Sequence, residues 1–174
     1  FMEELREAAI RSFEETGFPL RKQENYKYTH LEPVFDGELS FDFSPRKISF
    51  DDNELFRCDV PMLESHVLTV LNGFYYDPGA PPLHEFDNGI IYGSLREAIQ
   101  RYPDLVADYI GKEAPVEHES FVSLNTAFSQ DGIFLYVPDN QTLEKPIQII
   151  HLLLSDKNQM VHHRNLFVVG NNAS

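Results

Sequence analysis

Three histidines late in the chain come closest, by residue type and spacing, to a metal site. His162 and His163 are adjacent, and His151 lies eleven residues before the first of them. Imidazole nitrogen is a common ligand of zinc and of other transition metals. On a strand, however, neighbouring side chains point to opposite faces, so two adjacent imidazoles cannot easily meet one ion. The pattern favours ordinary packed or exposed histidines over a metal site.

The single cysteine, Cys58, is the only thiol that could act as a nucleophile or a ligand. Arg57 and Asp59 place one charge of each sign beside it, and no nearby feature clearly favours the thiolate. A lone cysteine closes no internal disulfide and builds no multi-cysteine zinc or iron–sulfur site. We therefore expect an unreactive thiol and a reducing, cytoplasmic environment.

Carboxylates are abundant, but no pair of them is selected for catalysis. The 174 residues carry 28 acidic and 14 basic side chains, a formal net charge of −14, and residues 31–120 hold 18 of the acids against 6 basic groups. Nothing in their spacing marks a general acid and its base. The chain also lacks a glycine-rich phosphate loop, a nucleophile elbow, and His-Glu-x-x-His or Cys-x-x-Cys motifs. We expect no catalytic residue and no bound metal.

The negative charge also argues against two classes of partner. Nucleic-acid binding without sequence preference needs a Lys/Arg surface that releases counterions. No apolar run approaches the roughly 20 residues of a membrane span, and no signal peptide opens the chain. We therefore expect neither nucleic acid nor membrane as a partner. Because the chain starts in a helical pattern and stops directly after an apolar strand, we also expect a fragment of a longer protein.

Three helical segments are predicted. Residues 2–16 carry an apolar stripe, which Gly17 and Pro19 end. Its members are Met2, Leu5, Ala9 and Phe13. Ser94-Leu95-Arg96-Glu97 has the pattern of a reciprocal capping box that begins a helix near residue 95, which Pro103 divides and Gly111 ends. Residues 121–129 form the third helix.

The clearest strand signal is a hairpin, because Asn-Gly satisfies the positive dihedrals of a type I′ turn. It consists of His66–Leu71, Asn72-Gly73 and Phe74–Tyr76. A loop is expected over residues 77–88, followed by a short strand at Ile90–Tyr92.

Further strands are predicted on both sides of this central part. Short half-buried strands are expected around Leu39, Phe41, Phe43, Ile48 and Phe50. Three apolar runs near the end suggest one sheet that continues further; they are Ile133–Val137, Ile147–Leu154 and Leu166–Val169. Their starts are 14 and 19 residues apart, which is compatible with stacked solenoid turns but does not establish a repeat.

Two stretches are more specific than these general patterns. The first contains Gly17-Phe18-Pro19, Arg21-Lys22 and Glu24-Asn25-Tyr26-Lys27-Tyr28-Thr29. The second contains Phe121-Val122-Ser123-Leu124-Asn125-Thr126-Ala127-Phe128, Asp131-Gly132, Val137-Pro138, Leu143-Glu144-Lys145-Pro146-Ile147 and Arg164-Asn165-Leu166. Over nearly all of residues 5–170 the chain resembles the N-terminal part of the SufB and SufD family. The order and separation of the motifs are closer to the SufD branch. Tyr26 stands where many relatives carry tryptophan, which changes little because both rings pack and offer a polar tip.

The resemblance implies an α+β fold in two parts. An N-terminal helical and mixed α/β domain is expected over residues 1–119, and the first strands of a right-handed parallel β-helix, truncated here, over residues 120–174. It also implies a non-catalytic scaffold subunit of the SUF iron–sulfur cluster assembly machine, which pairs with a SufB-like protein and works with a SufC-like ATPase. The suspected cluster residues of the family lie further along the β-helix. We therefore expect the full complex to handle the iron–sulfur cluster, and no residue of this chain, including Cys58, to bind a cofactor.

The motif positions are expected to be structural, because Thr29 and Asn125 can bond local backbone and the tyrosines can bury their rings. They are Glu24, Tyr26, Lys27, Tyr28, Thr29, Leu124, Asn125, Asp131, Gly132, Pro146 and Arg164. The alternative is a β-solenoid binding module or a carbohydrate-active enzyme, which would need a groove-facing carboxylate pair. An exposed edge at Leu166–Val169 would also let the isolated fragment self-associate.

Overall fold

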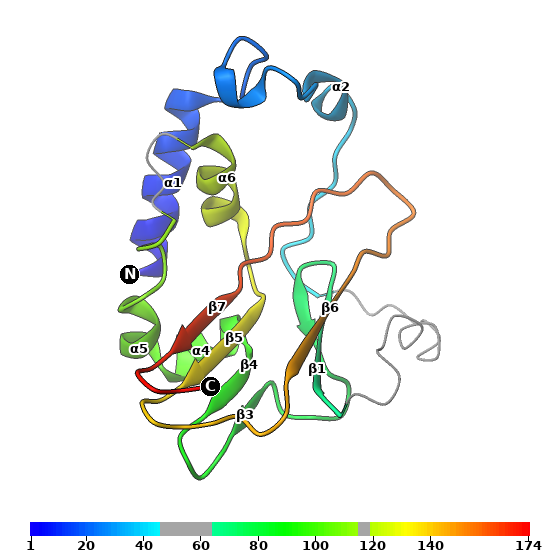
Figure 1. The fold of residues 1–174 in the computed structure, drawn as a ribbon. Coiled ribbons are helices and arrows are strands. Elements are labelled where there is room, and N and C mark those ends of the chain that lie inside the picture. The colour runs from blue at the N-terminus through cyan, green and yellow to red at the C-terminus, as the bar shows by residue number, and fades with distance from the viewer. Residues whose placement is uncertain (46–63, 115–118) are drawn as a thin grey trace.

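The computed structural model describes residues 1–45, 64–114 and 119–174 (Figure 1). In chain order its elements are α1 (Met2–Thr16), the 3-10 helix η1 (Glu24–Tyr26), α2 (Glu32–Phe35), β1 (His66–Leu71), β2 (Phe74–Tyr76), β3 (Leu83–Glu85), β4 (Ile91–Ser94), α4 (Leu95–Arg101), α5 (Pro103–Ala107), α6 (Ser120–Phe128), β5 (Ile133–Val137), β6 (Ile147–Leu152) and β7 (Leu166–Val169). The fold is α+β. No helix within these ranges is long and apolar enough to cross a membrane.

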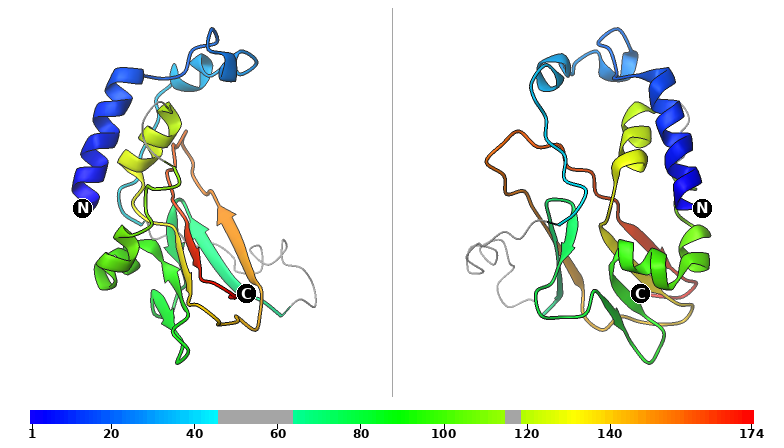
Figure 2. Two further views of the ribbon diagram at one scale, coloured as in Figure 1. Left: turned by 60° about the vertical axis from the view of Figure 1, so that its left-hand side comes forward. Right: turned by 180° about the vertical axis from the view of Figure 1, so that it is seen from behind.

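The strands form two small mixed sheets. In the first sheet β1 lies between β2, which is antiparallel to it, and β6, which is parallel. The second sheet has the order β3-β4-β5-β7, and β5–β7 is its one parallel pair. The two sheets stand next to each other, as both views of Figure 2 allow the reader to follow. Leu68 and Val70 of β1 share a buried cluster with Ile133 of β5, so apolar packing joins the sheets.

Helices α4 and α5 cover the second sheet on the side away from the first. α4 and α5 supply Leu95, Ala98 and Val106 to a buried cluster that contains Phe134 of β5, whose side chain is fully buried. α1 packs along α6 (Figure 1), where Ala9 meets Ala127. Small side chains at this contact let the two helix backbones approach closely.

Most of the predicted elements are confirmed. The helix at residues 2–16 and the strands Ile133–Val137 and Leu166–Val169 have the expected bounds. The hairpin is also confirmed, because Leu71 pairs with Phe74 across a turn in which Asn72 and Gly73 have φ values of 48° and 88°.

Three strand predictions need correction. The expected loop at residues 77–88 contains β3, which pairs with β4; a three-residue strand is too short to show an alternating pattern beside so many turn residues. The segment around Phe41 and Phe43 forms only an isolated bridge, between Ser40 and Gln159, while Ile48 and Phe50 lie outside the described residues.

The third correction concerns the C-terminal runs, which do not form one sheet. β5 pairs with β7, but β6 pairs with β1 in the first sheet. The turn after Val137 carries the chain from one sheet to the other, and the segment after Leu152 brings it back (Figure 1).

After β6 the chain returns to the second sheet, where β7 and the turn after it stack on β5 and the turn that follows β5. Phe134 pairs with Leu166, and beyond the strands the backbone N–H of Asn171 donates to Asp139 Oδ1 over 2.8 Å, both with an offset of 32 residues. Asn172 donates its side-chain amide to Asn140 Oδ1 over 3.2 Å, again 32 residues apart. Asn140 and Asn172 also share a left-handed backbone, with φ values of 59° and 54°. Two successive turns of chain thus have the same geometry and lie in register.

Candidate functional site

The three histidines considered as a metal site, His151, His162 and His163, do not converge. The rings of His151 and His163 lie 4.4 Å apart between centroids. His162 points elsewhere, with its ring 6.2 Å from that of Phe41 and 5.7 Å from that of Phe128. The separation of the adjacent pair is therefore confirmed. Among the described residues, no group of three or more His, Cys, Asp or Glu side chains is arranged to hold a metal ion; Cys58 lies outside them.

The N-terminal motif forms η1 and the turn after it. The Tyr26 hydroxyl donates to Glu119 Oε1 over 2.6 Å, and this bond raises the pKa of Tyr26 to about 12. Because Glu119 is the N-cap of α6, the bond fastens the motif to that helix. Lys27 forms an ion pair with Glu24 and lies 5.1 Å from the centre of the Tyr28 ring.

Tyr26 is half-buried, and the other members of the motif over residues 24–29 are exposed. Tyr28 is 88% exposed, and Thr29 is exposed with its backbone N–H bonded to the Tyr26 carbonyl over 2.9 Å. The structure therefore places the ring of Tyr26 at a contact with Phe121, whereas the expected burial of the Tyr28 ring is wrong.

Asp131 joins three segments through one buried carboxylate, which is 7% exposed. Its Oδ1 accepts hydrogen bonds from the Ser94 hydroxyl over 2.9 Å and from the Arg96 N–H over 3.0 Å. Its Oδ2 accepts from the Tyr75 N–H over 3.0 Å. The carboxylate therefore links β2 of the first sheet to the start of α4, where the helix dipole favours negative charge.

The remaining motif positions lie in α6, before β6 and before β7. Leu124 is buried. The Asn125 amide donates to the His163 carbonyl over 2.9 Å, so the expected bond to local backbone is replaced by one to a distant segment. The Pro146 carbonyl accepts from the His66 N–H over 2.9 Å. The Arg164 N–H donates to the Asp131 carbonyl over 3.0 Å, whereas burial lowers the pKa of its guanidinium, and its Nη1 has no partner among the described residues.

Ser94 caps α4 as predicted, although the box is one-sided. Its hydroxyl accepts from the Glu97 N–H over 3.1 Å, but its own N–H donates to the Pro82 carbonyl rather than to Glu97. We expect Ser94→Ala to lower the free energy of unfolding by about 0.5–2 kcal/mol, because the hydroxyl loses its cap bond to Glu97 and its bond to Asp131. Equilibrium urea unfolding measures this, with Ser44→Ala as an exposed control. Equal midpoints for the two variants would contradict the cap.

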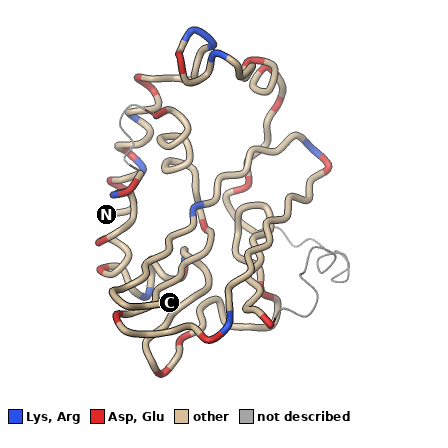
Figure 3. The backbone as a smooth tube through the Cα atoms, viewed as in Figure 1, with Lys and Arg blue, Asp and Glu red and all other residues tan. Residues whose placement is uncertain are grey.

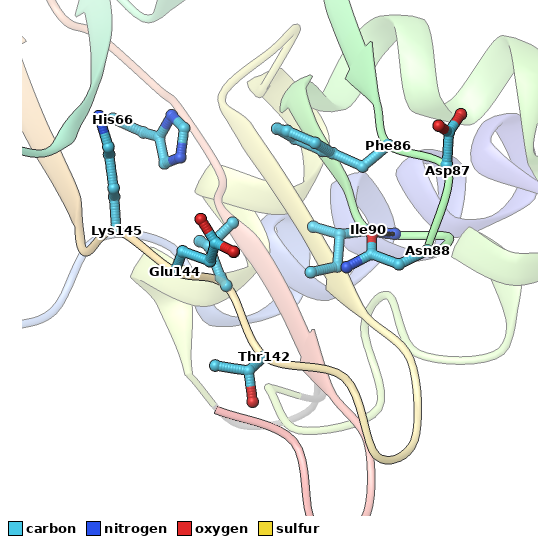
Figure 4. Close-up of a pocket in the computed structure, with 9 residues that line it drawn as sticks. His66, Phe86, Asp87, Asn88, Ile90, Thr142, Glu144 and Lys145 are labelled. Carbon is cyan, nitrogen blue, oxygen red and sulfur yellow. Dashed lines mark hydrogen bonds between the residues drawn. The ribbon is translucent and has the colours of Figure 1, made fainter.

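A cavity of about 420 Å³ opens between the two sheets at one end of β1 (Figure 4). Its size falls within the range of about 300–1,000 Å³ that is usual for small-molecule sites. The lining residues come from β1, the β3–β4 turn and the segment before β6; they are His66, Phe86, Asp87, Asn88, Ile90, Thr142, Leu143, Glu144 and Lys145. Figure 4 shows that His66, Phe86 and Glu144 point toward one space, while Asp87 points away from it.

Tyr92 holds the aromatic wall of this cavity in place. Its ring lies 5.2 Å from that of His66, 4.9 Å from that of His84 and 5.6 Å from that of Phe86. Its hydroxyl lies 3.1 Å from His66 Nδ1. Desolvation, followed by the nearby Lys145 and His84, lowers the pKa of His66. The His66 ring in this wall therefore favours its neutral form at neutral pH.

Sequence reasoning did not single out His66, Phe86 or Glu144 as a site. Glu144 belongs to the motif Leu143-Glu144-Lys145-Pro146, and this membership was the one available signal. In this cavity a single carboxylate faces inward, so it does not provide the carboxylate pair that a glycoside hydrolase would need.

Three histidines with lowered pKa values should make the free energy of unfolding depend on pH. Desolvation lowers the pKa of His66, His162 and His163 below the ordinary value of 6.5. The unfolded chain then binds more protons than the folded chain, so their contribution is intact above about pH 6.5 and is lost as the pH falls through the folded pKa values. We expect a lower urea midpoint at pH 5.5 than at pH 7.5. His162→Phe should reduce this difference, and an unchanged difference would contradict the role of His162.

Comparison with known proteins gives a consistent result. The model of the SufBD protein N-terminal region matches residues 1–149. The Arabidopsis thaliana iron–sulfur cluster assembly SufBD family protein ABCI9 is 36% identical over 81 residues, which cover 47% of this chain and 17% of that protein. A protein of the same description from Synechocystis is 27% identical over 157 residues, covering 89% of this chain and 33% of the relative. One from Staphylococcus aureus is 27% identical over 150 residues, covering 83% and 31%. The matches thus span at most a third of the length of these relatives.

Proposed function

Because this chain belongs to the SufBD family of iron–sulfur cluster assembly proteins, we propose that it is the N-terminal part of a SufD-like, non-catalytic scaffold subunit. In this proposal the full-length protein pairs with a SufB-like protein and works with a SufC-like ATPase in the cytoplasm. The full complex handles the iron–sulfur cluster, and this part of the chain binds no cofactor.

The observation that carries the scaffold role is the stacking of residues 134–142 on residues 166–174. A constant offset of 32 residues, kept through β5–β7 and the following turn, is the arrangement that a parallel β-helix repeats from coil to coil. We propose that this stack begins a right-handed parallel β-helix, with the first domain at residues 1–119 and the second from residue 120. A long stack of this kind offers strand edges and a regular face to a similar subunit.

The strand edges also support self-association of the isolated chain. β7 is an edge strand, and Phe167 and Val169 on it are 50% and 56% exposed. Unpaired backbone groups and exposed apolar side chains at an edge favour pairing with another strand. We propose that the isolated residues 1–174 dimerise through β7, which small-angle scattering over a concentration series tests. A scattering curve that does not change with concentration would contradict this.

The test of the scaffold proposal is co-purification of the full-length protein with SufB-like and SufC-like proteins of its own genome. We expect one complex in size-exclusion chromatography that contains all three chains. A SufB–SufC complex that forms without this protein, while the protein elutes alone, would overturn the proposal. Elemental analysis of the isolated chain, prepared without chelator, tests the proposal that this part of the chain binds no cofactor. About one equivalent of iron or zinc that is lost in a His162→Ala/His163→Ala variant would contradict that proposal.

A further inference from the structure

We propose that the cavity beside Glu144 binds an organic cation, either an alkylammonium or a guanidinium group, between the Phe86 ring and the Glu144 carboxylate. The proposal depends on the cavity alone and goes beyond the scaffold role.

The first argument is the carboxylate that faces the cavity. Figure 4 shows Glu144 near the middle of the lining residues, directed toward the space that His66 and Phe86 also face. Within the described ranges Glu144 has neither an ion pair nor a hydrogen bond, so its charge is available to a ligand. Lys145, the cation next to it in sequence, is paired over 3.1 Å with Glu64 rather than with Glu144.

The second argument is the aromatic wall. Phe86 is 40% exposed although it contacts the buried ring of Tyr92, so one part of its ring is held rigidly while another part remains open. A cation over an aromatic ring gains about 0.5–2 kcal/mol from the ring quadrupole, and more where water is displaced. Ile90 and Leu143 add apolar surface that suits the methylene or methyl groups of an organic cation better than a hydrated metal ion.

The third argument is the overall electrostatic field. The chain carries a net charge of −14, and Asp87 lies in the same wall as Phe86 although it points away from the cavity. A negative field around a concave site raises the local concentration of cations and lowers that of anions. Lys145 is the one Lys or Arg among the lining residues, which makes an anionic ligand the less favourable occupant.

The test uses the full-length protein and defined probes in isothermal titration calorimetry. Choline supplies a small free cation, and 3,3-dimethyl-1-butanol is its uncharged analogue of the same shape. Nα-acetyl-lysine amide and Nα-acetyl-arginine amide supply the same charges as side chains of a protein partner. We expect a charged probe to bind at least tenfold more tightly than the uncharged alcohol. Binding of choline would identify a free small molecule as the source, whereas binding of the amino-acid amides alone would identify a partner's side chain.

Two variants provide a matched control. Glu144→Gln and Asp87→Asn each remove one negative charge from the residues that line the cavity, but only Glu144 faces it. We expect at least tenfold weaker binding for Glu144→Gln and less than a twofold change for Asp87→Asn. Phe86→Leu should weaken binding about fivefold while retaining apolar volume. Equal losses in the two acid variants, equal binding of choline and its uncharged analogue, tighter binding of inorganic phosphate, or no binding of any cation would overturn the proposal.

Discussion

Gly132→Ala is expected to destabilise the protein by at least about 4 kcal/mol, which is a large part of the stability of an ordinary domain. Gly132 has a φ of 155°, and a Cβ atom built on it would lie 1.9 Å from the carbonyl oxygen of Arg164. The obstacle is backbone, which cannot swing aside as a side chain can. Because this close approach is where the chain starts β5 beside the segment that leads into β7, the variant should lose the stacking of the two strands. Soluble yield and urea unfolding of the full-length protein measure the effect.

Gly79→Ala is the matched control for Gly132→Ala. Gly79 also has a positive φ, 90°, but an added Cβ would meet nothing within 4 Å. Gly79→Ala should therefore lower the free energy of unfolding only by the cost of the unfavourable backbone conformation, about 1–2 kcal/mol. If both variants unfolded at the same urea concentration, the clash with Arg164 would not be the cause.

Asp131→Asn is expected to lower the free energy of unfolding by about 2–4 kcal/mol, because a buried acceptor becomes a donor that faces another donor. The carboxylate accepts from Ser94, Arg96 and Tyr75, and a side-chain amide has only one oxygen to offer to them. The residue volume hardly changes, so packing contributes little. Equilibrium unfolding of the purified variant, compared with the parent protein, gives the value.

Asp108→Asn makes the same chemical change at an exposed position and should shift stability by no more than about 0.5 kcal/mol. Hydrogen exchange adds a local readout, since the amides of Tyr75 and Arg96 should lose protection in Asp131→Asn. Unchanged protection at both amides would show that the carboxylate does not hold the two sheets together in solution.

The elements that local sequence determines were predicted well. The turn residues Asn72-Gly73 specify their hairpin because both adopt positive φ within four residues of chain. α1 and the cap at Ser94 likewise depend on residues three or four apart. The separation of His162 from His163 was also predicted, although both residues precede β7 rather than lying on a strand.

What the sequence did not predict depends on contacts between distant residues. β6 reaches its partner β1 across some 80 residues, and the Asn72 amide, which forms part of the hairpin turn, also donates to the Leu154 carbonyl over 2.8 Å. The cavity is built from three segments, and the carboxylate of Asp131 finds its donors far along the chain. The periodicity of apolar residues along the chain does not predict such long-range contacts. For the cavity, the motif around Glu144 was the only sequence signal.

The stacked turns at residues 138–142 and 170–174 restrict where residues can be inserted or deleted in this part of the chain. The pairing of β5 with β7 and of β6 with β1 fixes both ends of the connection over residues 138–146, and an inserted residue in its first part would break the backbone bonds that hold the two turns in register. The return path has a place to absorb change, because residues 155–158 are exposed. Insertions and deletions should therefore be tolerated at that bend, while the count of residues from the first turn to β6 stays constant.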